Sequence, residues 1–175
     1  MKIITKKETF RRDVTEFLQH SNWIEQEYSD VALEDAEKAW VYIMKQKRVT
    51  VKEILQVHKI LAKRIAPTIA GKLRTCDVWI GGEKKRYIDE DTLTFQLNNI
   101  FSAMLAFPGK TEDEKAQFTK NCHVFFEGIH PFEDGNGRTG RILYNWHRLQ
   151  LGLPINIIHE GEEQFAYYLW FKKTI

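Results

Sequence analysis

Residues 130–141 bring together the side chains of this chain that are best suited to chemistry, in the order His-Pro-Phe-Glu-Asp-Gly-Asn-Gly-Arg-Thr-Gly-Arg. Pro131 ends the preceding helix, because the residue before a proline avoids the helical conformation. Gly135 and Gly137 leave the backbone free to adopt positive φ and to approach a ligand closely. A helix is predicted to begin near Asn136, so its first turn directs unpaired N–H groups at the loop.

Two cations near the start of this helix, Arg138 in its first turn and Arg141 three residues further on, indicate an anionic ligand. Arg138 and Arg141 oppose the helix dipole at about 0.3–1 kcal/mol each, which makes sense if an anion lies between them and the N–H groups. A polyphosphate fits this description. Asp134 suits Mg²⁺ beside phosphates, and His130 titrates near neutrality and suits a general base. The alternative is a plain turn between two helices, with both arginines paired on the surface.

The segment resembles the Fic domain signature, HxFx[DE]GNGRxxR, at every specified position. The resemblance extends over roughly residues 50–172 and includes residues 71–75, which resemble the segment before the family's flap. It implies an all-α bundle with one short β-hairpin flap. It also implies transfer of AMP from ATP to a Tyr, Thr or Ser hydroxyl of a target protein or of the chain itself, with Mg²⁺.

Carried over to this sequence, the resemblance implies a role for each matched residue. His130 would deprotonate the target hydroxyl, and Asp134 would bind Mg²⁺. Phe132 would anchor the loop in the core. Arg138 and Arg141 would hold the β- and γ-phosphates. The nest around the α- and β-phosphates would be formed by Gly135, Asn136 and Gly137.

A short hairpin is predicted where residues 76–82 alternate and then reach Gly-Gly, before residues 84–88 continue. An ordinary surface connection is the alternative. By resemblance this is the flap, which would dock the target's backbone by β-augmentation through Val78, Trp79, Ile80 and Gly81. Tyr168 resembles the family's adenine-side tyrosine, and its alternative is a core aromatic.

A second match lies near the N-terminus, where Ser21 and Glu25 resemble the family's inhibitory motif, [ST]xxxE[GN]. By resemblance, the glutamate would pair with Arg141 and block productive placement of the γ-phosphate. Gln26 departs from the Gly or Asn of the motif, which puts the strength of inhibition in question. The alternative is a chance match.

Helical patterns surround both motifs. Capping boxes are predicted at residues 50–53 and 111–114, and apolar stripes at helical spacing begin at residues 32, 54 and 93. Asp91 is expected to cap the third of these helices, and residues 137–151 and 160–172 complete the set. We expect one compact unit, with an N-terminal helical segment at 1–48 and a Fic core at 49–175.

Composition narrows the class of protein. Lys and Arg number 26 against 24 Asp and Glu, so the net charge of +2 argues against a nucleic-acid partner. The longest apolar run, residues 39–44, is too short to cross a bilayer, and the start lacks a secretory signal.

Without a CxxC pair, Cys76 and Cys122 are expected to be reduced thiols. A soluble cytoplasmic protein is predicted. Many family members dimerise, so a homodimer is an expected partner.

The remaining histidines and aromatics are assigned to packing. His58 and His123 lie on apolar stripes and are expected to be semi-buried, whereas His147 and His159 are expected on the surface. The aromatic residues are expected in the core, with these as their main members: Trp40, Phe101, Phe125 and Phe126.

Three functions remain open from the sequence. The first is an autoinhibited protein adenylyltransferase that uses ATP and Mg²⁺. The second is a Fic-fold phosphotransferase, or a transferase of another nucleotide; kinase-type members have Lys at the position of Gly137, so Gly137 favours nucleotidyl transfer. The third is a nucleotide-binding module without turnover, against which the intact His130 argues.

Overall fold

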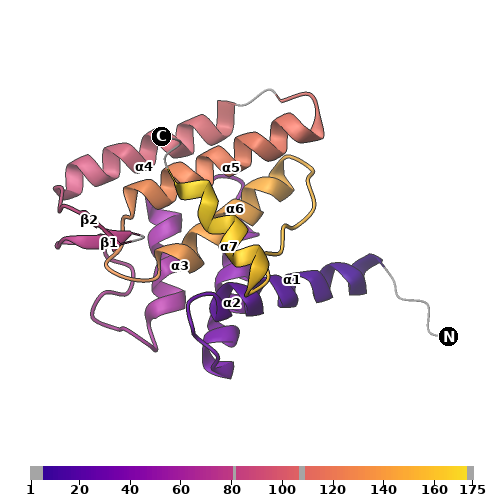
Figure 1. Cartoon of the computed structure of the whole chain (residues 1–175), viewed down its shortest axis with the longest axis horizontal. Coiled ribbons are helices and arrows are strands. Elements are labelled where there is room, and N and C mark those ends of the chain that lie inside the picture. The colour runs from indigo at the N-terminus through magenta and orange to yellow at the C-terminus, as the bar shows by residue number, and fades with distance from the viewer. Residues whose placement is uncertain (1–5, 81, 107–108, 173–175) are drawn as a thin grey trace.

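The structure, a computed structural model, describes residues 6–80, 82–106 and 109–172. Gly81, one of the predicted flap residues, lies outside the described residues. The chain forms a helical bundle with one hairpin (Figure 1). Its elements, in order, are α1 Lys6–Trp23, α2 Asp30–Ile43, α3 Val51–Ala62, β1 Val78–Ile80, β2 Glu83–Lys85, α4 Glu90–Ala106, α5 Glu112–Ile129, α6 Asn136–Gln150, α7 Glu162–Tyr168 and the 3₁₀ helix η1 Leu169–Phe171.

The capping chemistry that was expected for two helices is present. At the start of α5, Thr111 Oγ1 accepts from the Glu114 N–H at 3.2 Å, and Glu114 Oε2 accepts from the Thr111 N–H at 3.0 Å. The same reciprocal box opens α3. The cap expected at Asp91 is wrong, because Asp89 accepts from the Thr92 N–H at 2.8 Å and α4 begins at Glu90.

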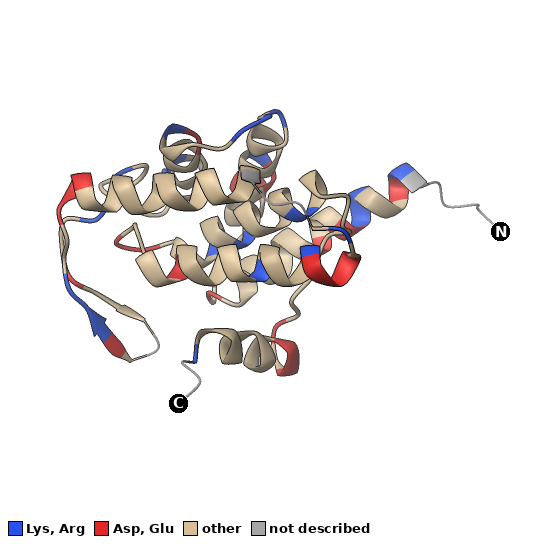
Figure 2. Cartoon of the chain, turned by 90° about the horizontal axis from the view of Figure 1, so that it is seen from above, with Lys and Arg blue, Asp and Glu red and all other residues tan. Residues whose placement is uncertain are grey.

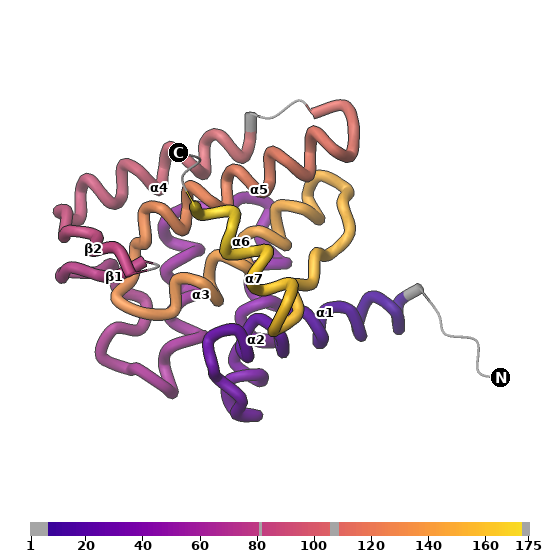
Figure 3. The backbone as a smooth tube through the Cα atoms, in the orientation of Figure 1, coloured from indigo at the N-terminus to yellow at the C-terminus, as the bar shows by residue number. Residues whose placement is uncertain are grey.

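Helix α6 forms the centre of the bundle and packs against α5, α3, α1 and α2. Figure 3 shows α4 and α5 side by side on one flank of the molecule. One continuous apolar cluster joins these helices, and its fully buried members include Leu18, Ile43, Ile54, Leu61, Leu97, Phe126, Phe132 and Ile142. The predicted boundary at residue 48 stays a prediction, since α1 and α2 share this cluster with the later helices.

The predicted hairpin is present, with Val78 opposite Lys85 and Ile80 opposite Glu83. Figure 2 shows it at one end of the bundle, with basic residues along β2. Val78 is buried, whereas the side chain of Trp79 is 65% exposed. Val78 therefore anchors the hairpin to the bundle, and Trp79 is exposed to solvent.

Two packing predictions are wrong. Phe125 is 67% exposed, because the inner face of α5 runs through Cys122, Phe126 and Ile129, and adjacent helical residues diverge by about 100°. His147 is 2% exposed instead of lying at the surface, because α6 is enclosed on all sides. Burial lowers the pKa of His147 to about 4.

Other expectations hold. His58 and His123 are buried, and both cysteines are free thiols. His159 is half-exposed and bonded to carboxylates. None of the described helices has the length and apolarity needed to cross a membrane.

Candidate functional site

The loop between α5 and α6 has a fixed shape. His130 ends α5 with φ of 52°, and Gly135 precedes α6 with φ of 77°. The Asn136 side chain closes the loop, because Oδ1 accepts from the Phe132 N–H and Nδ2 donates to the Phe132 carbonyl, both at 2.8 Å. Asn136 can therefore contribute to an anion nest only through its backbone N–H. Phe132 is fully buried, as expected for the anchor.

Arg74 joins this loop to the base of the hairpin. Its buried guanidinium donates from Nε to the His130 carbonyl at 2.9 Å, from Nη1 to Cys76 O at 2.8 Å and from Nη2 to Arg86 O at 3.1 Å. Its backbone N–H donates to Pro131 O at 2.8 Å. Arg74 therefore joins the loop to the residues that flank both strands of the hairpin. The sequence drew attention to residues 71–75 but gave no role to Arg74.

His58 supports the same loop from α3. Its ring stacks on Phe132 with centroids 3.9 Å apart. Nδ1 accepts from the Gly71 N–H at 3.0 Å, so Nε2 carries the proton and donates to Asp134 O at 2.9 Å. Burial lowers the pKa of His58 to about 4, which keeps this donor and acceptor pair in place at neutral pH. Its apolar position in the sequence had suggested packing only.

His130 presents one free nitrogen. Nδ1 lies 3.3 Å from the Glu127 carbonyl, so Nδ1–H donates there and Nε2 is the basic atom. Burial lowers the pKa of His130 below its ordinary value, and the Arg74 charge acts in the same direction. A neutral imidazole at pH 7 is the form that can accept a proton.

The two arginines of the motif are both buried in the N-terminal half of α6. Arg141 donates from Nε to Ser21 Oγ at 2.9 Å, and from Nη2 to Ser21 O at 2.8 Å and Glu25 Oε1 at 2.7 Å. Among the described residues, no partner faces the buried Nε of Arg138. A buried cation with an unused donor favours an additional anion.

Glu25 lies directly over the first turn of α6. A Cβ built on Gly137 would collide with Glu25 Oε1, so the carboxylate would have to shift from its present position if residue 137 carried a side chain. The next residue, Gln26, has φ of 59°, in the left-handed region. Glycine and asparagine adopt that conformation most easily, which explains the motif's preference and identifies Gln26 as strained.

Tyr167 reaches this site, whereas Tyr168 points elsewhere. The Tyr167 ring is buried with its centroid 5.8 Å from Arg141 Cζ, and its hydroxyl lies 2.9 Å from His123 Nε2. Tyr168 is 41% exposed, and its hydroxyl accepts from Gln164 Nε2 at 3.0 Å. The assignment of Tyr168 to the adenine stays a prediction, and the residue beside the arginine is its neighbour.

Glu127 is a buried acid that the sequence did not single out. Its Oε1 has no partner among the described residues, and Oε2 lies 4.0 Å from His130 Nδ1. A Cβ on Gly140 would collide with Oε1, so glycine makes room for the carboxyl. Burial raises the pKa of Glu127 to about 8, against the opposing charge of Arg141. Glu127 is therefore largely protonated at neutral pH.

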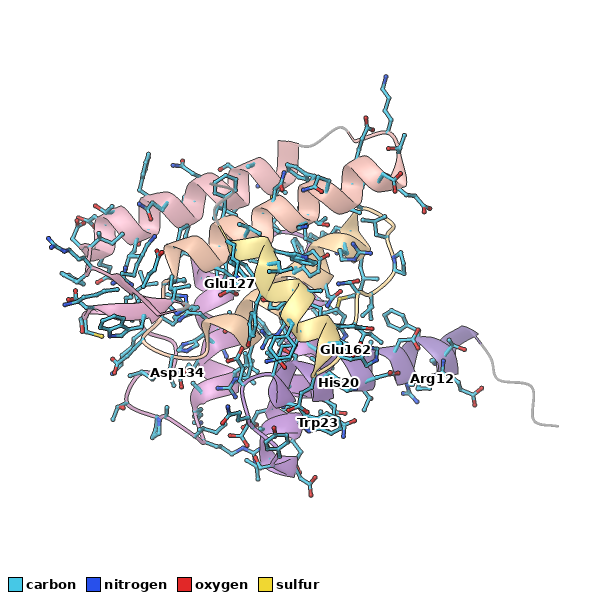
Figure 4. The ribbon with its side chains drawn as sticks, in the orientation of Figure 1. Arg12, His20, Trp23, Glu127, Asp134 and Glu162 are labelled. Carbon is cyan, nitrogen blue, oxygen red and sulfur yellow. The ribbon has the colours of Figure 1, made fainter. Side chains whose placement is uncertain are left out.

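Asp134 faces solvent on the loop (Figure 4). Its Oδ1 accepts from the Gly135 N–H at 2.7 Å, which leaves Oδ2 free to bind a cation. Mg²⁺ takes one or two carboxylates with phosphate oxygens, so this donor fits the predicted ion. Of the residues predicted for the flap, Val78, Trp79 and Ile80 form strand β1 of the hairpin, and Gly81 lies outside the described residues.

The model of the Fic/DOC family matches residues 48–147. A curated protein of Aedes aegypti, "Protein adenylyltransferase Fic", is 29% identical over 120 residues, which cover 69% of this chain and 23% of that protein. The protein of the same name from Drosophila sechellia is 30% identical over 129 residues, covering 71% and 24%. The chain thus spans about a quarter of the length of these relatives.

Solved structures share the fold. Fic-1 of C. elegans (aa134–508) superposes with a TM-score of 0.72 at 20% identity, over 97% of this chain and 57% of that one. A Fic domain-containing signaling protein from Bacteroides thetaiotaomicron superposes with a TM-score of 0.75 at 19% identity, over 94% and 74%.

Proposed function

The chain belongs to the Fic/DOC family, and from that premise we propose that it is an autoinhibited protein adenylyltransferase. The proposed reaction transfers AMP from ATP to a Tyr, Thr or Ser hydroxyl, on a target protein or on the chain itself. The observation that carries the proposal is the pairing of a free His130 Nε2 with two buried guanidinium groups at the start of α6. The adenylyltransferase names of the relatives agree with it.

His130 supplies the base. Its neutral Nε2 takes the proton of the target hydroxyl as the hydroxyl oxygen attacks the α-phosphorus. The new bond is P–O to the target, and the bond that breaks joins the α-phosphorus to the oxygen that bridges to the β-phosphate. The products are the AMP ester, pyrophosphate and the proton on His130. Most of the rate enhancement comes from position and charge.

The start of α6 holds the phosphates. The N–H groups of Asn136 and Gly137, the positive end of the helix and the two arginines face the same anion. Arg138 has an unused buried donor for it. Asp134 would hold Mg²⁺, which neutralises phosphate charge when bound.

Glu25 supplies the inhibition. Its carboxylate already occupies Arg141 and the space over Gly137, so it competes with the γ-phosphate for both. Ser21 accepts two further hydrogen bonds from the same side chain, one from Nε and one from Nη2. Release of the segment 21–26 would free Arg141 for ATP.

The hairpin supplies the docking edge for a target. Each strand of this two-stranded sheet has an unpaired edge within the described residues, and an extended peptide can add to such an edge. Main-chain hydrogen bonds carry little sequence information, so the exposed Trp79 is the residue we expect to select side chains of the target.

The test uses ATP labelled at the α- or at the γ-phosphate. Label transferred to protein from α-labelled ATP alone supports AMP transfer. Label from γ-labelled ATP alone indicates phosphotransfer, and no label from either in both wild type and Glu25→Gly, with ATP bound, indicates a binding module. In parallel, calorimetry should show weaker ATP binding in Arg138→Ala and loss of the Mg²⁺ response in Asp134→Ala. Unchanged affinity and Mg²⁺ response in both variants would contradict the site assignment.

A further inference from the structure

Outside the proposed active site, α1 and the segment before α7 bring three metal-binding side chains together. Glu16 and His20 are four residues apart on α1 and therefore share a face, and His159 approaches them from the segment that follows α6. One ligand atom from each lies within 4.8 Å of the others. Figure 4 shows His20 of α1 next to Glu162 at the start of α7.

His159 is already oriented as metal-bound histidines are. Its Nδ1 lies 2.8 Å from Glu163 Oε2, and the same oxygen accepts from the backbone N–H of His159 at 3.0 Å. The other nitrogen, Nε2, lies 3.0 Å from Glu16 Oε1. A carboxylate on one ring nitrogen, with the other directed at a second ligand, is the arrangement that fixes tautomer and ring orientation around metal ions.

His20 is also held in place. Its ring contacts the His159 ring edge-to-face with centroids 4.6 Å apart, and Trp23 packs against it at 4.8 Å. The Glu160 N–H donates to His20 Nδ1 at 3.3 Å, a long contact that an ion bound at Nδ1 would replace. The acidic residues at the start of α7, coloured red in Figure 2, add negative charge around the cluster.

We propose that Glu16, His20 and His159 bind one divalent ion of the zinc class, which links α1 to the segment before α7. Two imidazoles and one carboxylate form a donor set that zinc accepts, with a fourth position left for water. Mg²⁺ prefers oxygen ligands, so this site is chemically distinct from the one at Asp134. The ion would take the place of the proton that Glu16 and His159 share.

The geometry asks for a small adjustment. Ligand atoms about 2.0–2.2 Å from a tetrahedral ion lie roughly 3.4 Å from one another. The pair between Glu16 and His159 is at 3.0 Å, and all the ligand atoms lie within 4.8 Å of one another, so any pair wider than roughly 3.4 Å must close. The side chains of Glu16 and His159 are each 41% exposed, so rotation about their own bonds suffices.

The site has a consequence that rests on the proposed function. Ser21 lies in the last turn of α1 and Glu25 follows shortly after its end, and both contact Arg141. An ion that fastens α1 to the segment before α7 would hold Glu25 in place. Zinc-loaded protein should therefore bind ATP several-fold more weakly than zinc-free protein, and Glu25→Gly should abolish the difference.

Zinc chloride titrated into chelator-treated full chain, without nucleotide, tests the site itself. We expect one equivalent to bind with a dissociation constant of about 1 μM or tighter. His159→Gln and Glu16→Gln should abolish binding, and Glu163→Gln should weaken it by about tenfold. Glu162→Gln and His130→Ala are the matched controls and should bind zinc normally, the second because it excludes the active-site imidazole as the ligand.

Two results would overturn the proposal: no saturable binding to wild type, or equal affinity in wild type, His159→Gln and Glu16→Gln. Melting curves without metal check that the variants fold. Cobalt(II) added to wild type gives a reading that needs no variant, because intense visible absorption indicates a four- or five-coordinate site and the weak spectrum of the aqua ion contradicts it. None of these measurements depends on AMP transfer, so failure here is separate from failure of the proposed function.

Discussion

The catalytic loop and the segment that covers it are held in opposite ways. The loop at residues 130–135 is supported by Arg74, His58 and Asn136, three side chains from three parts of the fold. Among the described residues, the segment at residues 21–26 forms no charge pair with α6 other than the one with Arg141, packs its buried Ile24 against Ile158 and Tyr167, and includes a strained residue, Gln26. Polar contacts from several elements keep the geometry of the loop fixed, whereas the described polar contacts of the covering segment centre on one guanidinium.

This contrast separates preorganisation from regulation. Removing one support of the loop leaves two others, so its reacting groups stay near their positions. Under the proposed function, removing the partner of Arg141 frees a guanidinium for the γ-phosphate. Substitutions in the first region should therefore lower activity or stability, and substitutions in the second should change activity in either direction.

The largest effect is expected from His130→Ala. The loop supports do not use the imidazole, so the fold and ATP binding should persist while transfer drops by about 10²–10⁴-fold. Burial lowers the pKa of His130 below the ordinary histidine value of 6.5. As the pH is lowered, the wild-type transfer rate should therefore begin to fall only below pH 6.5. Single-turnover incorporation of α-labelled AMP measures both. Near-normal transfer by folded His130→Ala would contradict the role of the base.

Arg74→Ala tests whether the loop is held redundantly. It removes donors from three carbonyls, and we expect a loss of about 3 kcal/mol in the free energy of unfolding. The loss should be accompanied by faster hydrogen exchange in the hairpin, with α6 still protected. Arg74→Lys is the matched variant, because it keeps the positive charge but loses the planar set of N–H donors of the guanidinium. Uniform exchange across loop and hairpin, unchanged from wild type, would show that Arg74 is dispensable.

Glu25→Gly tests the covering segment. A charge-assisted Arg–carboxylate pair contributes about 1.5–3 kcal/mol, so its removal should raise productive ATP engagement by about 10–100-fold. Because the Glu25 side chain is partly exposed, we expect an increase near the lower end of this range, about tenfold. The measurement is incorporation of α-labelled AMP into the protein, and adding Arg141→Ala should abolish the gain. If Glu25→Gly is no more active while His130-dependent transfer is present, residues 21–26 are not inhibitory.

Glu127→Gln sharpens the comparison through pH. The folded-state pKa of about 8 exceeds the ordinary value of 4.5, so the native state retains a proton that the unfolded chain releases. Stability is therefore full below pH 4.5 and falls as the pH rises to about 8. Gln cannot ionise, so Glu127→Gln should gain roughly 3–4 kcal/mol on wild type between about pH 5 and pH 8. Parallel melting curves with the same offset at both pH values would argue against a buried neutral acid.

The smallest effect is expected at Gln26. Left-handed backbone costs a residue with a side chain about 1 kcal/mol relative to glycine. Gln26→Gly should therefore favour the docked position of Glu25 and lower basal transfer by about fivefold, opposite in sign to Glu25→Gly. Gln26→Asn should give an intermediate value in the same labelling assay. A rise in activity with Gln26→Gly would mean that the positive φ belongs to a released form.

The helical fold and the loop at residues 130–141 were predictable because their signals are local. The capping boxes at Thr50 and Thr111 satisfy their own backbone groups within one turn, so the sequence contains both partners. The cap of α4 was expected at Asp91 and is found at Asp89. Aspartate at either position can cap a helix, and the apolar stripe does not fix the turn at which the helix begins.

The errors share a different cause. On a helix, neighbouring residues point about 100° apart, so Phe125 is exposed although Phe126 beside it is buried. His147 looked exposed because polar residues surround it in the sequence, whereas α6 is enclosed by other helices. The supports from Arg74 and His58 could not be found, since their partners are carbonyls and rings distant along the chain.

The fit of Glu25 over Gly137 also bears on how this sequence can evolve. A side chain at residue 137 would occupy the space of the Glu25 carboxylate, so neither position can be optimised alone. A lineage that acquired lysine at 137 would lose this glutamate's place, and selection on the glutamate would then relax. We therefore expect residues 25 and 137 to covary among descendants of this sequence. A substitution at one of them should arise on the same branch of the family tree as a substitution at the other.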